Sequence, residues 1–331
     1  MNRKYGLRML AIAVVVLLMG CKNDKPASVR SVGKDAADAA VNPSWNVSTQ
    51  GGREFLSDRE GNTVALDRQY TRIIVISPGA VETLYLIGAE ESIAAITSGR
   101  DPVWPEDKTA SLPTIGNTAR PNLEMAVSFE PDLIIGNSMT AGFIEDLARR
   151  GYTVIIHGAE SLEDIFSSAL LLGRLTGRDA EAASLVAEKR ERLEGLKAGL
   201  RQNPLGLKGA FLYSASPIMA FTGDSLAGAV LTVLGVENIA AGLSAAQPIL
   251  QPEYLLAQNP DFLFGAMAIT RAEDILAADS VIAQTRAGRE MNIRIVASSL
   301  FLRPSPRIVE GILELYGIVQ GYAPPHAGAE Q

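Results

Sequence analysis

The side chains that most often perform catalysis or bind metal ions are scarce in this chain. It has 331 residues but one cysteine, Cys21, and two histidines, His157 and His326. A single cysteine excludes disulfides within the chain, cysteine-rich zinc sites and redox pairs. Two histidines, one of them in a polar C-terminal segment, disfavour a site that binds bare zinc or manganese through several imidazoles. We therefore expect no direct metal ligands from the chain and no cofactor.

Catalytic motifs are equally sparse. The segment Gly136–Thr140 lacks the second glycine of a G-x-S-x-G nucleophile elbow, and a catalytic triad would depend on His157 alone. No phosphate-binding loop of the G-x-G-x-x-G or G-x4-G-K-[ST] kind occurs. The sequence therefore favours a protein that is not an enzyme, with a surface-anchored hydrolase using His157 as the alternative from another class.

The position of Cys21 has a specific meaning. A basic start is followed by the apolar run Met9–Met19 and then by Gly20 and Cys21, which is the order of a secretory signal. The apolar run is shorter than the roughly 20 residues that span a bilayer. The stretch Leu18–Cys21 resembles a bacterial lipoprotein signal, which implies cleavage before Cys21 and attachment of lipid to it. We expect an extracytoplasmic protein that is lipid-anchored to a membrane, in the periplasm or on the outer face of the cell membrane.

The next segment, Lys22–Pro43, is polar and contains almost no large apolar residue. It cannot bury enough surface to offset its chain entropy, so we predict a flexible tether. The formal net charge is −7, and no basic stripe is found. Binding to nucleic acid is therefore not expected.

Beyond the tether, strand and helix patterns alternate, which predicts an α/β fold with parallel sheets covered by helices. Arg53–Asp67 is expected to form a hairpin around Gly61. A segment almost without glycine, from Arg178 to about Arg201, predicts a helix of about 36 Å that could bridge two lobes. Strands are expected at 72–77, 133–135, 153–156, 209–213, 262–264 and 294–297, and helices from Pro78 and at 142–150, 162–176, 225–234, 271–278 and 305–322.

The alternation is an imperfect internal repeat. Glu124–Gly136 and Glu253–Gly265 share the pattern E-x6-P-D-x3-G. Pro-Asp ends a short helix and begins a buried strand, whereas a glutamate at the start of each helix has only its favourable interaction with the helix dipole to explain it. Two lobes of one design, facing each other across a cleft, are predicted.

These segments together resemble a known family. The chain resembles the substrate-binding proteins of ABC importers for vitamin B12, haem and ferric siderophores. The segments that carry the resemblance are Arg72–Thr97, Gly116 with Pro121–Glu124, Glu130–Ile135, Glu253 with Asn259–Asp261, and Ser305–Val309. The resemblance covers about residues 53–322 and implies two Rossmann-like lobes joined by one long rigid helix, with the ligand between them. It implies that Glu124 and Glu253 dock onto arginine pockets of a membrane permease, which works with an ATPase.

The predicted organisation follows from the signal and the resemblance. We expect a monomer. Its parts are a signal peptide at 1–20, a tether at 21–44, an N-terminal lobe at 45–177, a connecting helix at 178–201, a C-terminal lobe at 202–323 and a tail at 324–331.

The ligand is expected beyond the carboxyl ends of the parallel strands. Arginines and aromatic side chains in the loops there suit a bulky anionic ligand with flat apolar faces, because guanidinium groups bind oxyanions and stack on rings. A ferric siderophore fits, and some relatives place arginines around the chelate. The expected contacts are Ser77, Arg100, Trp104, Asn117, Arg120, Met139, Tyr213, Phe221, Gln247, Met267, Phe301 and Arg303.

Two other ligands remain as alternatives. Haem would need an axial ligand, for which His157 and Tyr213 are the candidates. Cobalamin-binding relatives use aromatic side chains against the corrin ring. Gln247 stands where the resemblance places one of their tryptophans, which weakens this alternative.

Overall fold

The computed structural model describes residues 45–244 and 248–323, which belong to one compact unit, Val41–Gln331. The predicted signal peptide, the tether, Cys21, Gln247, His326 and the tail lie outside the described residues. No helix in the described part of the chain is both long and apolar enough to cross a membrane.

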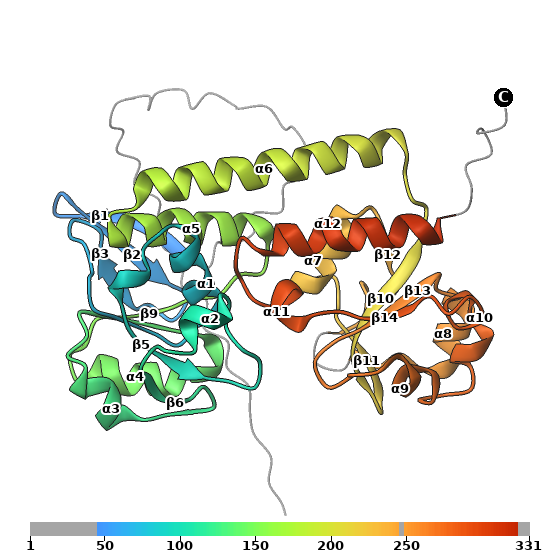
Figure 1. Ribbon diagram of the computed structural model, residues 1–331, viewed down its shortest axis with the longest axis horizontal. Coiled ribbons are helices and arrows are strands. Elements are labelled where there is room, and N and C mark those ends of the chain that lie inside the picture. Colours follow the sequence, from blue (N-terminus) through green and yellow to red (C-terminus); the bar gives the residue numbers. More distant parts are fainter. Residues whose placement is uncertain (1–44, 245–247, 324–331) are drawn as a thin grey trace, which may run out of the picture. The chain divides into compact units, whose positions relative to one another are not determined.

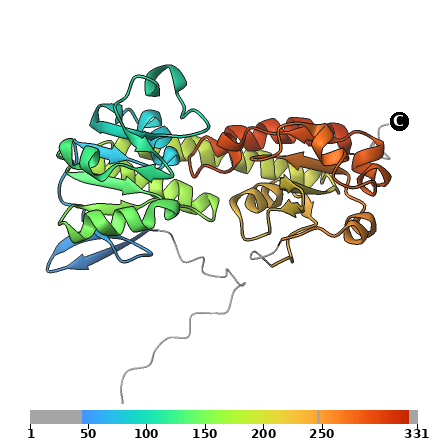
Figure 2. The ribbon, with the colours of Figure 1, turned by 90° about the horizontal axis from the view of Figure 1, so that it is seen from below.

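The described chain begins with a small antiparallel sheet of β1 (Trp45–Gln50), β2 (Arg53–Asp58) and β3 (Thr63–Ala65). The predicted hairpin is confirmed, whereas β1 is an addition that its polar, exposed sequence does not announce. Asp58 links this sheet to the next one: its carboxylate accepts hydrogen bonds from the backbone amides of Asn62 (2.8 Å) and Ile156 (2.7 Å). Figure 2 shows the small sheet in blue.

The first large sheet has the strand order β7-β6-β5-β4-β8-β9, and its strands are parallel except β7, which forms a hairpin with β6. The prediction of a purely parallel sheet is corrected accordingly to a mixed, mainly parallel one. The strands are β4 (Ile73–Val75), β5 (Ile93–Ser98), β6 (Thr114–Asn117), β7 (Arg120–Pro121), β8 (Leu133–Gly136) and β9 (Val154–Ile156). The helices between them are α1 (Pro78–Leu86), η1 (Glu90–Ser92), α2 (Glu106–Thr109), α3 (Leu123–Ser128), η2 (Ser138–Thr140) and α4 (Ala141–Arg149).

The second large sheet has the order β11-β10-β13-β14, with β12 also paired to β10, and only β11 runs antiparallel. Its strands are β10 (Lys208–Ala215), β11 (Ile218–Ala220), β12 (Glu237–Asn238), β13 (Phe262–Gly265) and β14 (Ile293–Ile295). Its helices are α7 (Leu226–Val233), α8 (Pro252–Gln258), α9 (Ala272–Leu276), η3 (Ile282–Gln284), α10 (Arg286–Arg289), α11 (Ser298–Phe301), α12 (Ile308–Val319) and η4 (Gln320–Tyr322).

Two helices connect the sheets, α5 (Leu162–Thr176) and α6 (Asp179–Gln202) (Figure 1). The predicted helix at 178–201 corresponds to α6, which packs against α5 and α12. In α5, Leu172 and Leu175 join the core under the first large sheet, whereas Ile165 and Phe166 join the core of the second. Burial of each such apolar side chain contributes about 1.5–3 kcal/mol to the stability of the folded protein. The connection is therefore a packed helix pair with a shared core, not a free rod.

Candidate ligand site and docking surface

The carboxyl ends of β5 and β6 form one corner of the first large sheet. Ser98 of β5 pairs with Asn117 of β6, which in turn pairs with Arg120 of β7. Arg100 follows β5 by two residues, so both arginines project from the same corner. Both are exposed, and neither has an ion-pair or hydrogen-bond partner for its guanidinium among the described residues. The Asn117 side chain itself accepts the amide hydrogen of Ala119 (2.8 Å) and shapes the turn.

Ser77 and His157, at the ends of β4 and β9, form a buried pair. Each is 1% exposed, and the Ser77 hydroxyl lies 2.8 Å from His157 Nδ1, while His157 Nε2 lies 3.3 Å from the Ser168 hydroxyl. Trp45 packs edge-on against the imidazole at 5.3 Å between ring centroids. Burial lowers the pKa of His157 to about 4. Both ring nitrogens of His157 lie within hydrogen-bond distance of a serine hydroxyl. Because Ser77 and His157 are buried, neither side chain is exposed for the predicted contact with a ligand, for ligation of haem or for hydrolysis.

Arg303 has a different environment from the one predicted. Its guanidinium donates to Glu82 Oε1 (2.9 Å) and to the carbonyl oxygens of Pro102 (2.8 Å) and Asp101 (3.0 Å). The side chain is 13% exposed, and Glu82 is 0% exposed. Arg303 is therefore held by the protein itself rather than left open for an anion.

Trp104 lies in the loop that Arg303 contacts. It is half-buried, and the guanidinium of Arg307 stacks over its ring at 4.6 Å from the centroid. Arg307 also pairs with Glu82 at 3.3 Å. A cavity of about 530 Å³ lies against the same loop, lined by residues between Ile96 and Thr114.

Glu82 and Arg307 were not among the predicted site residues. A charged residue among the apolar residues of the predicted helix after Pro78 was the available signal for Glu82. Arg307 stood in the motif Ser305–Val309, where only the resemblance drew attention to it.

The predicted contacts in the second half of the chain are divided. The rings of Tyr213 and Phe221 pack together at 4.9 Å between centroids, and both are half-buried. Phe301 is 2% exposed and packs against Phe211, so it belongs to the core and not to an open site.

Two methionines are open to solvent. Met139, after β8, is 83% exposed, and Met267, after β13, is 52% exposed. Met267 has a left-handed backbone (φ 58°), and its amide donates to the Ser298 hydroxyl at 2.9 Å. Each large sheet therefore presents one exposed apolar side chain in the loop after a buried strand.

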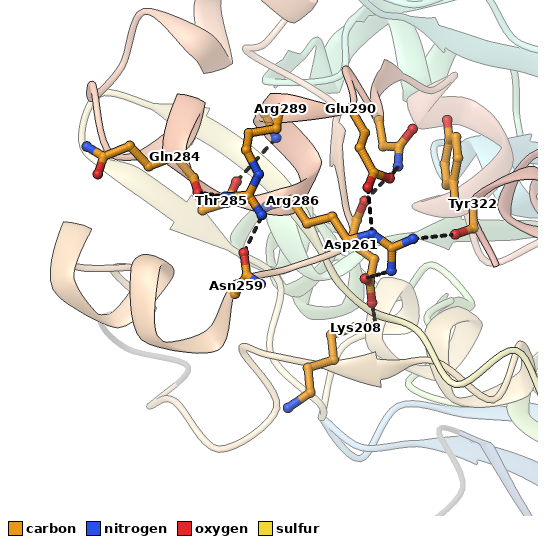
Figure 3. Close-up of polar contacts among 11 residues, drawn as sticks. Lys208, Asn259, Asp261, Gln284, Thr285, Arg286, Arg289, Glu290 and Tyr322 are labelled. Carbon is orange, nitrogen blue, oxygen red and sulfur yellow. Dashed lines mark hydrogen bonds and ion pairs between the residues drawn. The ribbon is translucent and has the colours of Figure 1, made fainter. Parts of the chain in front are cut away.

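Glu124 and Glu253 occupy equivalent places: each is the second residue of a short helix, α3 or α8, and each is exposed. Neither carboxylate has an ion-pair partner in the described part of the chain. The C-terminal end of helix α8 is fixed by a hydrogen bond. Asn259, which ends the helix, accepts the amide hydrogen of Arg286 at 2.8 Å (Figure 3). Arg286 in turn pairs with Asp261 at 2.6 Å. Glu253 is thus exposed, without an ion-pair partner among the described residues, on a helix whose end is fixed by hydrogen bonding.

Among residues 45–244 and 248–323, no group of three or more His, Cys, Asp and Glu side chains could hold a metal ion. The features that remain for binding are the exposed arginines at one sheet corner, the half-buried aromatic residues and the two exposed methionines. This set is suited to contacts with the outer surface of a ligand.

The chain is similar to known proteins of one family. Residues 73–300 match the periplasmic binding protein family. A cobalamin-binding protein from Halobacterium salinarum is 25% identical over 266 residues, which cover 76% of this chain and 70% of that protein. The Fe(3+) dicitrate-binding periplasmic protein FecB of Escherichia coli is 27% identical over 212 residues, 62% of this chain and 70% of that protein.

A third relative matches almost from end to end. The uncharacterized ABC transporter substrate-binding lipoprotein YvrC of Bacillus subtilis is 22% identical over 323 residues, which cover 95% of this chain and 96% of that protein. The family match spans more than half of the chain. The chain belongs to the periplasmic binding protein family, of the type that serves vitamin B12, haem and ferric siderophores, and is a substrate-binding protein rather than an enzyme.

Proposed function

We propose that the protein is an extracytoplasmic solute-binding lipoprotein of an ABC importer, anchored to a membrane through Cys21. It captures an anionic iron(III) chelate of the siderophore kind between two lobes, 45–177 and 202–323, joined by the helix at 178–201. It then delivers the unchanged ligand to the permease. The observation that carries the ligand class is the pair of exposed arginines at one corner of the first large sheet, Arg100 and Arg120, whose guanidinium groups have no partner among the described residues.

The chemistry of those arginines favours an anion. A guanidinium binds carboxylate and other oxyanions through parallel N–H donors, and such charge-assisted bonds are the strong ones. Arg303 does not compete for this role, because Glu82 and two carbonyl groups occupy it. A relative named for iron(III) dicitrate, itself an anionic chelate, supports the same class. Haem is less favoured, because the buried His157 would have to give up two hydrogen bonds to ligate iron.

Titration with ferric dicitrate and with a ferric hydroxamate tests this proposal, with Trp104 fluorescence as the signal. We expect Arg100→Ala and Arg120→Ala each to weaken binding by about tenfold or more, the typical value of a lost charge-assisted hydrogen bond. Added salt should weaken it as well. The matched control is Arg150→Ala, because Arg150 is also exposed and without a side-chain partner in the described chain but follows α4, at the opposite edge of the sheet. Equal effects of all three variants would contradict the proposal.

Cobalamin is the second candidate, favoured by the relative from Halobacterium salinarum and by the exposed Met139 and Met267. Methionine is flexible and polarizable, and it adapts to large apolar faces. Cyanocobalamin would then bind with little dependence on salt or on Arg100 and Arg120, and Met139→Ala with Met267→Ala would weaken it. The absorption spectrum of the protein as isolated separates the two candidates, because a corrin and a ferric chelate have different visible bands.

The proposed delivery step depends on Glu124 and Glu253. Two exposed carboxylates on separate short helices, with no partners in the described chain, suit two basic sockets on a permease. Complementary charge speeds the encounter and fixes its orientation. The permease and its ATPase are accordingly the proposed partners.

A further inference from the structure

Glu82 is an unusual residue for the middle of a helix packed on a sheet. It lies in α1 between two other buried residues, and its side chain is 0% exposed. Oε1 accepts from Arg303 Nη1 at 2.9 Å and lies 3.3 Å from Arg307 Nη1, while Oε2 is buried without a hydrogen-bond partner in the described chain. A buried carboxylate is costly unless it is paired. Such a group calls for an explanation beyond the packing of α1.

Arg303 connects Glu82 to a loop. It follows α11, 221 positions along the chain from Glu82, and donates to the carbonyl oxygens of Pro102 at 2.8 Å and Asp101 at 3.0 Å. A guanidinium has five N–H donors in a planar fork, so one side chain can bind a carboxylate and two carbonyl groups at once. A lysine could neutralise Glu82, but its compact ammonium lacks that geometry.

The segment 303–307, which contains Arg303, makes two further contacts with the first half of the chain. Arg307 stacks over Trp104 at 4.6 Å. The Pro304 backbone lies against Gly79 in the first turn of α1, where a β-carbon would come within 2.6 Å of the Pro304 carbonyl oxygen. Only glycine allows this approach, so the segment 303–307 is seated closely on α1.

The loop that this segment contacts is anchored at its end and exposed at its start. Val103 is buried in the core of the first large sheet, and its carbonyl oxygen accepts a hydrogen bond from the Thr109 hydroxyl at 2.5 Å. Gly99, Arg100, Asp101 and Pro102 are exposed, and the cavity of about 530 Å³ adjoins the loop. An exposed stretch with few packed neighbours samples many conformations unless something fixes it. Arg303 supplies the hydrogen bonds to the Asp101 and Pro102 carbonyls, and Arg307 supplies the face against Trp104.

We propose that Glu82 and Arg303 are positioning residues that fix loop 99–105, and that they thereby set how tightly Arg100 and Trp104 hold the ligand. Glu82 acts through Arg303: it fixes the guanidinium from one side while the guanidinium binds the loop from the other. The assignment rests on the proposed function only in treating Arg100 and Trp104 as ligand contacts. It replaces the predicted direct contact between Arg303 and the ligand.

The chain provides a second carboxylate with two cationic partners for comparison, although its side chain is 39% exposed and that of Glu82 is 0% exposed. Glu310 of α12 also binds two cations through Oε1, Lys189 at 2.6 Å and Arg192 at 2.8 Å, and its Oε2 is likewise buried without a partner in the described residues. These cations belong to α6, and none of the contacts involves loop 99–105. Glu310→Gln therefore makes the same chemical change as Glu82→Gln at a place that does not touch the loop.

Fluorine NMR of the full chain labelled with fluorotryptophan tests the positioning role without any ligand. The chain has two tryptophans: Trp104 reports on the loop, and Trp45, buried with its indole N–H bonded to Ile156, is the internal reference. We expect Glu82→Gln and Arg303→Lys to move the Trp104 resonance toward its position in the unfolded chain and to leave Trp45 unchanged. Glu310→Gln should move neither. An unchanged Trp104 resonance in both loop variants would overturn the proposal.

Ligand binding supplies the second measurement, with ferric dicitrate and cyanocobalamin as probes. We expect Glu82→Gln and Arg303→Lys to weaken binding of whichever probe the unaltered protein binds by about 10- to 100-fold, since displacement of a contact by about 1 Å has effects of that size. Glu310→Gln should leave the affinity as it is, and equal weakening by Glu310→Gln would overturn the positioning role. If the unaltered protein binds neither probe, the proposed function fails, while the Trp104 resonance still decides the positioning role. If Glu82→Gln does not fold, Arg303→Lys alone decides, because it keeps a positive charge beside Glu82.

Discussion

The two copies of the repeat, Glu124–Gly136 and Glu253–Gly265, fold alike. In each, an exposed glutamate is the second residue of a short helix, and the residue before the proline is left-handed, Glu130 at φ 47° and Asn259 at φ 45°. In each, the aspartate after the proline binds the backbone where a neighbouring strand begins. Asp132 accepts from the amides of Thr71 (2.9 Å) and Arg72 (3.1 Å), and Asp261 from that of Lys208 (2.7 Å).

The copies differ in their ion pairs. Asp261 also binds Arg286 at 2.6 Å, and Arg286 continues to Glu290 at 2.9 Å (Figure 3). Asp132 has no ion-pair partner in the described part of the chain. The comparison shows that Pro-Asp is a structural device in both halves and that a charge network strengthens it only in the second. In the described part of the chain, the carboxylates of Glu124 and Glu253 have no ion-pair partner, in contrast to that of Asp261.

The largest difference between the copies should follow removal of the aspartates. Asp261→Ala removes one of the two carboxylate partners of Arg286 and the acceptor of the Lys208 amide, and we expect the free energy of unfolding to fall by about 2–4 kcal/mol. Asp132→Ala removes hydrogen bonds to exposed backbone amides and should lower it by about 1–3 kcal/mol. Chemical denaturation of both variants measures the difference. Equal losses would show that the Arg286 network adds nothing to the second copy.

Acid should destabilise the protein through His157, the histidine within the described residues, which lies in the first half of the structure. Its pKa is about 4 in the folded protein and near 6.5 in the unfolded chain. Between these values the unfolded chain binds a proton that the folded protein does not, so the free energy of unfolding falls as the pH drops from 6.5 to 4. The loss approaches about 3 kcal/mol at the lower end.

Unfolding of the unaltered protein and of His157→Gln, compared across that pH range, isolates this contribution. Other groups titrate equally in both proteins, so the difference between the two curves belongs to His157. Parallel curves would mean that the imidazole is not kept neutral by burial.

Exchanging the left-handed residues Glu130 and Asn259 between the two copies should have a smaller effect on stability. Asparagine tolerates this conformation better than glutamate, which lacks a short side chain to satisfy the local backbone. We expect Glu130→Asn to stabilise the protein by about 0.5–1 kcal/mol. Asn259→Glu should destabilise it by more than that, because the hydrogen bond from the Arg286 amide is also lost. Thermal unfolding of both variants gives the comparison, and a loss of stability on Glu130→Asn would contradict it.

The smallest effect on stability is expected at the glutamates. Glu124→Ala with Glu253→Ala should change the free energy of unfolding by no more than about 0.5 kcal/mol, since both side chains are exposed and unpaired in the described chain. Uptake in cells that contain the cognate permease should nevertheless be lost, with ligand affinity unchanged. The control is Glu91→Ala with Glu273→Ala, which removes two exposed glutamates and the same charge. Normal uptake by the first double variant would refute the docking role.

Local signals explain which elements could be predicted. The predicted helix at 162–176 has the bounds of α5 because Ser161 and Asp164 form a capping box and Gly177 ends the helix with φ 70°. The strands β5 and β6 of the first large sheet and the short strands β7, β11 and β12 were not predicted, and neither was β1, since their pairing is decided by distant partners. The mixed direction of both sheets follows from those additional strands.

The candidate site divides in the same way. The glutamates of the repeat and the exposed arginines Arg100 and Arg120 could be named from the spacing of motifs and from their places in predicted loops, although Arg120 belongs to the unpredicted strand β7. The pairing of Arg303 with Glu82 could not be predicted, because the two residues are 221 positions apart in the sequence.

Composition and order along the chain determined that this is an α/β protein of the periplasmic binding protein family with few groups for catalysis. They suffice because caps, apolar periodicity and repeated motifs act over a few residues. Only the tertiary structure decided which arginines have no partner in its described part, that His157 and Phe301 are buried, and that Arg303 bonds both to Glu82 and to the loop of Trp104. Those outcomes depend on desolvation and on contacts between distant segments, which no local pattern encodes.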